Sequence, residues 1–138
     1  MKENCIFCKI IRGEIPSNTL YEDEDFKVIL DISPAEKGHA ILLPKMHNEN
    51  LFELEDEIAA KALVVAKKVA LAMRDELGFD GMNLLQNNGE AAGQTVFHFH
   101  LHLIPRLQED QVMMKWTPGR YEDGEAARLA EAIATRIM

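Results

Sequence analysis

Three histidines, His98, His100 and His102, alternate with large apolar residues in a short segment that Pro105 closes. Side chains of a β-strand point to opposite faces with a period of two, so residues 96–104 predict one face of imidazoles. Same-face neighbours lie about 6.6–7 Å apart, which gathers three groups that titrate near neutrality on one surface. Such a surface can bind a metal ion, bind an anion or attack phosphorus. The opposite face is predicted to be core and carries Phe97, Phe99, Leu101 and Leu103.

A loop with several glycines, residues 87–95, directly precedes the histidines. Glycines let a backbone aim its N–H groups at an anion without a Cβ in the way. Gln94 and Thr95 add side-chain donors, and Asn87 follows the preceding predicted strand. Taken alone, such a loop is more often an ordinary turn. Beside three aligned histidines it indicates half of a phosphate site.

The histidines themselves allow nucleophilic chemistry. A neutral imidazole can attack phosphorus and form a phosphohistidine intermediate, which divides one hard displacement into two easier steps. Its neighbours can donate hydrogen bonds to phosphoryl oxygens or protonate the leaving group. His100 has such a neighbour on each side. The same three side chains could instead ligate one catalytic metal ion, and their spacing leaves this alternative open.

A second group of metal-ligand residue types comes from distant parts of the chain. Cys5 and Cys8 are the only cysteines, and a Cys-x-x-Cys pair in a reducing compartment is typical of a metal clip or a redox pair. With His47 and His98 they form a Cys₂His₂ set, the mixture that tetrahedral zinc prefers. Two small buried cysteines and a solvated His47 are an equally good interpretation of these residues alone. Four protein ligands would leave no open position, so such a zinc would be structural.

Composition limits the remaining possibilities. The chain has 138 residues, 47% hydrophobic and 28% charged, which predicts a single globular domain over 1–138. A net charge of −8 argues against a general nucleic-acid or acidic-membrane surface. The first residues lack the apolar core of a signal peptide, and Lys67 and Lys68 interrupt the longest apolar stretch. We therefore expect a cytoplasmic protein without nucleic-acid or membrane partners.

Periodicity predicts an α+β domain built on an antiparallel sheet. Apolar residues recur at three- and four-residue steps over 56–77, which predicts a long amphipathic helix with Gly78 as its C-cap. A short helical turn is predicted at 10–16 and a last helix within 124–138. Alternating or apolar runs between turn residues predict strands at 19–22, 26–30, 39–43, 81–86 and 96–104.

The chain resembles the histidine triad (HIT) family, in particular its bacterial zinc-containing members of the nucleoside phosphoramidase branch. The resemblance covers nearly the whole chain. It rests on the His-x-His-x-His run and on four segments: Cys-Ile-Phe-Cys-Lys-Ile-Ile with Gly-Glu-Ile-Pro, Asp-Ile-Ser-Pro at 31–34, Gly-His at 38–39, and Gly-Gln-Thr-Val at 93–96. It implies a HIT-like antiparallel sheet of about five strands, one long helix and a C-terminal helix, with sheets joined across a homodimer. Residues 1–15 would form the Cys-x-x-Cys segment and 120–138 a C-terminal helical extension.

The resemblance also implies roles for individual residues. The middle histidine of the family becomes transiently nucleotidylated, which makes His100 the nucleophile and His102 and His39 its companions. Thr95 stands where many relatives have serine, a departure that retains the hydroxyl. The implied zinc ligands are Cys5, Cys8, His47 and His98. The implied nucleotide-binding residues are Asp31, Ile32, Ile6, Phe7, Ile10, Asn87, Gly93, Gln94, Thr95 and Trp116, the last on a segment that crosses toward the partner's site in family dimers.

The implied activity is that of a nucleotide hydrolase or transferase acting at the α-phosphorus of nucleoside phosphoramidates, dinucleoside polyphosphates or acyl adenylates. Its substrates would be purine nucleotides, derivatives of AMP or GMP. The reaction would pass through a nucleotidyl-histidine, with a structural zinc and no cofactor in the chemical step. One alternative is a nucleotide-binding regulatory or adaptor protein whose hydrolysis is incidental, since a fold does not fix a role. The other is the metalloenzyme with three histidine ligands.

Overall fold

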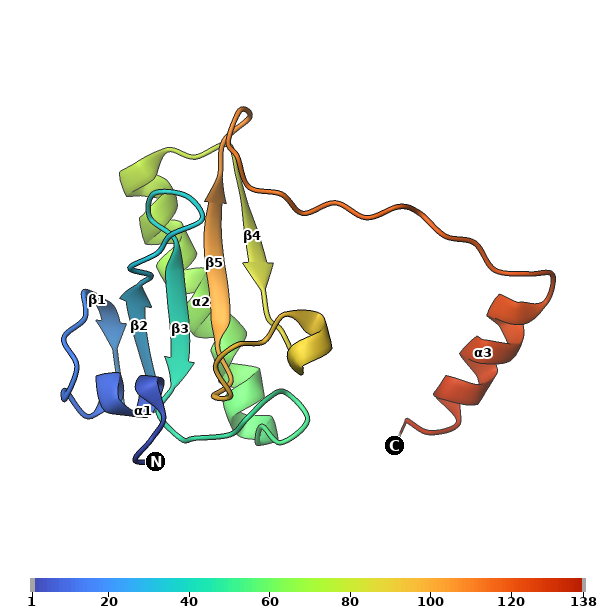
Figure 1. Ribbon diagram of the computed structural model, residues 1–138, viewed down its shortest axis with the longest axis horizontal. Coiled ribbons are helices and arrows are strands. Elements are labelled where there is room, and N and C mark those ends of the chain that lie inside the picture. Colours follow the sequence, from blue (N-terminus) through green and yellow to red (C-terminus); the bar gives the residue numbers. More distant parts are fainter. Residues whose placement is uncertain (1, 138) are drawn as a thin grey trace.

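A five-stranded antiparallel sheet forms the centre of the molecule, and the long helix α2 covers one of its faces (Figure 1). The computed structural model describes residues 2–137. The strands lie in the order β1-β2-β3-β5-β4. This arrangement confirms the predicted α+β class. The elements are α1 (Ile6–Ile11), β1 (Thr19–Glu22), β2 (Phe26–Leu30), β3 (Ala40–Pro44), α2 (Asp56–Leu77), β4 (Gly81–Leu85), the 3₁₀ turn η1 (Glu90–Ala92), β5 (Leu101–Arg106) and α3 (Glu125–Ala134).

Strand alternation divides the core into two clusters, one on each face of the sheet. Val28 and Leu42 pack with the buried stripe of α2, whereas Ile29 and Ile41 pack with α1 on the other face. All five residues of β3 are buried because both faces of this central strand are covered. The N-terminal Cys-x-x-Cys segment is thereby held against the sheet, at the end where α1 lies in Figure 1.

Helix α2 has the bounds that its apolar period predicts. Asp56 and Glu57 in its first turn complement the positive end of the helix dipole. Gly78 ends the helix in the left-handed region at φ 62°, and its N–H donates to the Arg74 carbonyl at 2.9 Å. Strands β1 and β2 also match their predicted ranges, and β3 is shifted by one residue.

The helical turn predicted at 10–16 is misplaced, because α1 begins at Ile6 and ends at Ile11. Its N-cap is Cys5, whose sulfur accepts from the Cys8 N–H at 3.4 Å. A thiol is not among the usual capping groups, so no start signal for this helix is recognisable in the sequence. The expected stop is present, since Gly13 has a φ of 83° and its N–H donates to the Ile10 carbonyl.

The predicted histidine strand 96–104 is also wrong in its first half, since β5 begins only at Leu101. The Phe99 N–H donates to the Asn48 carbonyl at 2.7 Å, outside any strand ladder. Phe97 is exposed, so the predicted core face begins only at Phe99. Pro105 does not close the strand but pairs with Met82 inside it. The three imidazoles therefore do not form one flat row.

Beyond β5, an extended segment leads away from the sheet to α3 (Figure 1). The predicted last helix was 124–138, and the observed one is Glu125–Ala134; Met138 lies outside the described residues. None of the residues of α3 is buried. No helix within residues 2–137 combines the length and apolarity needed to cross a bilayer. That 1–138 acts as one domain with a helical extension stays a prediction.

Gly38 should tolerate alanine less well than Gly13. Both have a positive φ, 93° and 83°, but a Cβ on Gly38 would lie 2.4 Å from Leu77 Cδ1, and one on Gly13 would meet nothing within 4 Å. We expect Gly38→Ala to lower the free energy of unfolding by about 2–3 kcal/mol and Gly13→Ala by about 1 kcal/mol, measured by urea denaturation. Equal losses would show that the Leu77 side chain moves aside at no cost.

Candidate active site and metal centre

Strands β3 and β5 bring His39 close to His100 and His102, which lie far from it in the sequence. His39 directly precedes β3, His100 directly precedes β5, and His102 lies in β5 opposite Ile41. The ring centroid of His102 is 5.0 Å from that of His39 and 5.0 Å from that of His100. His39 and His100 are buried and His102 is half-buried. The structure thus joins the predicted catalytic residues in one cluster.

The hydrogen bond of His100 defines which of its nitrogens can react. Its Nδ1 lies 2.7 Å from the His98 carbonyl oxygen. A carbonyl only accepts hydrogen bonds, so Nδ1 must carry the proton. In the neutral ring the lone pair is then on Nε2. Burial lowers the pKa of His100 and favours this neutral form.

A chain of hydrogen bonds defines the other two rings in the same way. The Ala35 N–H donates to His39 Nδ1 at 2.9 Å, so a neutral His39 carries its proton on Nε2. That Nε2 lies 2.9 Å from His102 Nδ1, which must accept. His102 therefore keeps its own proton on Nε2, as a free donor beside His100. Sequence reasoning missed the Ala35 amide, because every non-proline residue carries this group.

Burial lowers the pKa of each of the three rings. Burial and the neighbouring His100 and His39 rings lower the pKa of His102 to about 4. Burial also lowers the pKa of His39, and Asp31 partly opposes this. An oxygen of Asp31 lies 3.7 Å from His39 Nε2, and its other oxygen accepts from the Ser33 N–H at 2.8 Å. Asp31, which the resemblance assigns to nucleotide binding, is thus both a turn residue and a neighbour of the cluster.

His98 does not face this cluster; it faces the two cysteines. Its Nδ1 lies 3.6 Å from Cys5 Sγ, 3.5 Å from Cys8 Sγ and 3.2 Å from His47 Nδ1. His47 Nδ1 lies 3.4 Å from Cys8 Sγ. These four ligand atoms all lie within 4.8 Å of one another. The predicted Cys₂His₂ set is therefore assembled, and it can hold a metal ion.

The separations and proton positions fit a tetrahedral cation. Zinc bonds of about 2.3 Å to sulfur and 2.0 Å to nitrogen separate ligand atoms by roughly 3.3–3.8 Å. His98 Nε2 lies 2.8 Å from the Pro44 carbonyl, so Nε2 carries the proton and the Nδ1 lone pair faces the sulfurs. Burial raises the pKa of the Cys8 thiol, so a metal that binds there must displace a proton.

Asp31, His39 and His102 form a second group whose ligand atoms lie within 4.8 Å of one another. This group fits a cation poorly, because the Ala35 N–H already occupies His39 Nδ1 and leaves the proton on the Nε2 that faces His102. The metalloenzyme alternative, with His98, His100 and His102 on one ion, also disagrees with the geometry. His98 Nδ1 faces the cysteines, and His100 Nδ1 faces a carbonyl.

Comparison with known proteins shows the family of this chain. The family model described as "HIT domain" matches residues 12–109. The chain belongs to the HIT family. "Protein hit" of Bacillus subtilis is 45% identical over 138 residues, which cover 98% of this chain and 95% of that protein. "Adenosine 5'-monophosphoramidase HNT1" of Saccharomyces cerevisiae is 43% identical over 119 residues, which cover 86% of this chain and 73% of that protein.

Solved HIT structures superpose on nearly the whole chain. A crystal structure of a HIT family member from Bacillus subtilis has a TM-score of 0.93 at 45% identity and covers 99% of both chains. SMU.412c from Streptococcus mutans has a TM-score of 0.95 at 40% identity, over 100% of this chain and 88% of the other. A zinc-bound histidine triad family protein from Mycobacterium smegmatis has a TM-score of 0.76 at 40% identity, over 96% of both chains.

The apolar residues that the HIT resemblance assigns to nucleotide binding differ in burial. Phe7 and Ile10 are buried, and the Phe7 ring meets the His100 ring edge-on with centroids 4.9 Å apart. Ile6 is half exposed, and Ile32 is 88% exposed beside Asp31. Phe7 therefore packs against the proposed nucleophile, and Ile6 and Ile32 remain free to contact a ligand.

The loop before the HIT triad is braced by Gln94. Its side-chain oxygen accepts from the Gly89 N–H at 2.7 Å, and its nitrogen donates to the Glu49 and Val96 carbonyls at 2.7 and 3.0 Å. Gln94 is 3% exposed, so both of its amide hydrogens are used inside the loop and the predicted phosphate contact is not open to them. The pattern of a polar residue beside glycines could not distinguish a brace from a ligand.

The other residues predicted on the phosphate side lie in and beside this loop. Gly93 has a φ of 95°, a backbone conformation that favours glycine, and a Cβ there would meet Asn87 Nδ2 at an ordinary contact distance of 3.6 Å. Thr95 is exposed and lines a hollow of about 350 Å³ together with Ile6 and His47. Their contact with phosphate stays a prediction.

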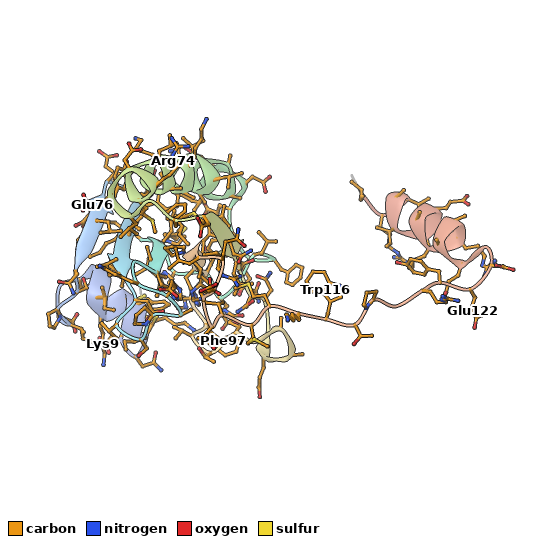
Figure 2. The ribbon with its side chains drawn as sticks, turned by 90° about the horizontal axis from the view of Figure 1, so that it is seen from above. Lys9, Arg74, Glu76, Phe97, Trp116 and Glu122 are labelled. Atoms are coloured by element: carbon orange, nitrogen blue, oxygen red, sulfur yellow. The ribbon has the colours of Figure 1, made fainter. Side chains whose placement is uncertain are left out.

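Trp116 lies outside this chain's own site. It is 83% exposed on the extended segment, and Figure 2 shows it well away from the sheet. A role in substrate selection by its own chain is therefore not supported by the geometry. That it reaches a partner's site stays a prediction.

The pKa of His102 can be measured directly. In a ¹H–¹³C NMR titration of the imidazoles, His102 should titrate at about pH 4, well below the usual pKa of about 6.5. Because the unfolded chain then binds the extra proton between these values, stability should fall as the pH drops from about 6.5 toward 4. His102→Gln should flatten that part of the pH dependence. A His102 pKa near 6.5 would contradict the neutral, hydrogen-bonded ring.

Proposed function

We propose that this HIT protein is a nucleoside phosphoramidase that works through a nucleotidyl-histidine intermediate on His100. The observation that carries the proposal is the hydrogen bond from His100 Nδ1 to the His98 carbonyl, because it leaves the lone pair on Nε2. Relatives named as adenosine 5'-monophosphoramidases support a nucleotide substrate. We take the substrate to be a purine nucleotide with an amine on its α-phosphorus.

The reaction divides between the three rings. His100 Nε2 attacks the α-phosphorus, a phosphorus–nitrogen bond forms, and the bond to the leaving amine breaks with its electron pair going to the amine. The Nε2–H of His102 can donate to a phosphoryl oxygen or toward the leaving amine. Water then attacks the nucleotidyl-histidine and releases the nucleotide. The proton that the amine takes up in the first step is returned by water in the second.

The surrounding residues would hold the nucleotide in place. Asp31, half-buried next to His39, is the proposed partner of the ribose hydroxyls. Exposed Ile32 and Ile6 are the proposed contacts of the base, with Phe7 behind the nucleophile. Asn87, Gly93 and Thr95 are the proposed phosphate-side residues. The Gln94 side chain acts by keeping that loop closed.

We also propose that Cys5, Cys8, His47 and His98 hold a structural zinc ion. Bound zinc would link the N-terminal segment, the loop after β3 and the segment before β5. Four protein ligands leave no position for substrate, so it would take no part in the chemical step. The coupling to catalysis is mechanical, because His98 offers its side chain to this cluster and its carbonyl to His100.

His100→Ala should remove the intermediate and the activity. We expect kcat/KM for adenosine 5'-phosphoramidate to fall by on the order of 10³-fold or more, and His102→Asn to lower it by about 10²–10⁴-fold. Rapid quenching followed by mass spectrometry should find the nucleotidyl group on His100 in the wild type. The same measurement should find no nucleotidylated residue in His100→Ala. Gln108→Ala, an exposed change just beyond the other end of β5, serves as the control with unchanged rate.

Wild-type turnover by His100→Ala would disprove the proposed nucleophile. Tight nucleoside monophosphate binding with negligible hydrolysis of phosphoramidates, dinucleoside polyphosphates and acyl adenylates would disprove the hydrolase. It would favour the nucleotide-binding regulator.

Metal content should separate the two ligand groups. We expect about one zinc per chain in the purified protein, lost in Cys8→Ser and retained in His39→Asn. The reason is that the Cys₂His₂ group directs free lone pairs inward, whereas the group with Asp31, His39 and His102 does not. Metal is measured by mass spectrometry, and a cobalt-loaded sample should show thiolate-to-cobalt absorption. Cys8→Ser should also lower the free energy of unfolding by several kcal/mol. Zinc loss in His39→Asn alone would place the metal in the second group.

A further inference from the structure

The chain contains a single Asn-Gly pair, Asn88–Gly89, which lies in the turn between β4 and η1 (Figure 1). An asparagine before glycine is chemically labile, because the backbone nitrogen of the next residue can attack the side-chain amide carbon. Glycine has no Cβ to shield that nitrogen. Every other asparagine of the chain precedes a residue with a Cβ. The sequence therefore favours loss of the amide at Asn88 over loss at the other asparagines.

The reaction is deamidation through a cyclic imide. The Gly89 nitrogen gives its proton to base and bonds to Asn88 Cγ. The bond from Cγ to Nδ2 breaks, and ammonia leaves with the electron pair of that bond and a proton from water. Water then opens the imide at either carbonyl, which gives aspartate or isoaspartate. Water is consumed and ammonia is released, and no oxidant or reductant is needed.

The nucleophile of this reaction is held by the Gln94 side chain. The Gly89 N–H donates to Gln94 Oε1 at 2.7 Å. Gln94 is buried, and its own amide donates to the Glu49 and Val96 carbonyls at 2.7 and 3.0 Å. A proton held in such a bond reaches base in the solvent only when the structure opens locally, as in the slow exchange of hydrogen-bonded amides. The closed loop therefore keeps the Gly89 nitrogen unreactive.

The side-chain amide that would be attacked is held as well. Asn88 Oδ1 accepts from Gln86 Nε2 and from the Leu51 N–H, both at 2.8 Å. Asn88 Nδ2 donates to Gln86 Oε1 at 2.7 Å. Attack requires Asn88 Cγ to close on the Gly89 nitrogen, and these hydrogen bonds resist that movement.

We propose that Asn88 is a deamidation site of this protein and that Gln94 controls its rate, because the reaction occurs only after the Gly89 N–H leaves Gln94 Oε1. The products oppose the return of the closed loop. An aspartate carboxylate has no hydrogen for Gln86 Oε1. Isoaspartate lengthens the main chain before Gly89 and so displaces its N–H from Gln94. The proposal is independent of the phosphoramidase activity.

Rates in the wild type test whether the folded loop protects the site. The full-length protein and a peptide of residues 84–92 are kept in warm, mildly alkaline buffer, and both are followed by peptide mapping with mass spectrometry. Asn88 should convert at least about tenfold more slowly in the protein than in the peptide. Asn87, in the same peptide but followed by a residue with a Cβ, is the internal control. Equal rates in protein and peptide, or faster loss at Asn87, would overturn the proposal.

Hydrogen exchange of the Gly89 amide, followed by NMR in the wild type, tests the role of Gln94 without a substitution. Exchange and deamidation both need this N–H to leave Gln94 Oε1, so both should be slowed by a similar factor relative to the peptide. A Gly89 amide that is strongly protected while Asn88 deamidates at the rate of the peptide would contradict control by Gln94.

Substitutions then separate the two holding side chains. Gln94→Met keeps the side-chain length and removes the acceptor, and should speed deamidation at Asn88 by about tenfold. Gln86→Met, which releases the Asn88 amide but leaves Gln94 in place, should speed it less. Gln108→Met, the same change at an exposed glutamine outside the loop, is the matched control with the wild-type rate.

Slow amide exchange in β3 and β5 identifies variants that keep the folded sheet. A folded Gln94→Met protein with the wild-type rate would overturn the proposal, and so would a larger effect of Gln86→Met than of Gln94→Met. If Gln94→Met unfolds the sheet, the comparison of exchange and deamidation in the wild type decides.

Discussion

The hydrogen bond between His100 Nδ1 and the His98 carbonyl connects the two halves of this site. It is 2.7 Å long and joins residues whose side chains face different clusters. Through its carbonyl, His98 holds the proton of His100 on Nδ1; through its ring, it belongs to the cysteine cluster. Anything that moves His98 must therefore move the lone pair of the proposed nucleophile. This makes the packing of the Cys-x-x-Cys segment part of the catalytic geometry.

The same bond explains why the strand begins late. A regular strand through 96–100 would place His98 and His100 on one face and would give the His98 carbonyl to a neighbouring strand. Instead the Phe99 N–H turns to the Asn48 carbonyl, and the His98 ring reaches the Pro44 carbonyl. The pairing with β3 begins only at Leu101, and the pairing with β4 begins at His102. Because the backbone is irregular before Leu101, neighbouring histidines of one motif can face different clusters.

Sequence alone predicted what depends on local period and composition. Helix α2 and strands β1 and β2 have their predicted bounds, because their apolar spacing and turn residues agree with the tertiary structure. Grouping Cys5 and Cys8 with His47 and His98 was also possible, since metal-ligand types are few. The Gln94 brace and the Ala35 donor were not predictable, because they depend on which distant carbonyl or ring faces them. The prediction of where α1 starts was wrong for a similar reason, since a thiol acts as its cap.

A net charge of −8 opposes the binding of a phosphate group, so the proposed site must hold its substrate with hydrogen-bond donors. Buried rings with lowered pKa values attract an anion less than imidazolium would, but only a neutral ring has the lone pair that attacks phosphorus. Substrate affinity must then come from N–H donors, including His102 Nε2–H and the loop backbone. Since each ring's proton is fixed by a neighbour, Ala35 for His39 and His98 for His100, the site keeps one nucleophile and one donor on neutral rings. Burial of these rings therefore stabilises the core and also keeps the proposed nucleophile in its neutral form.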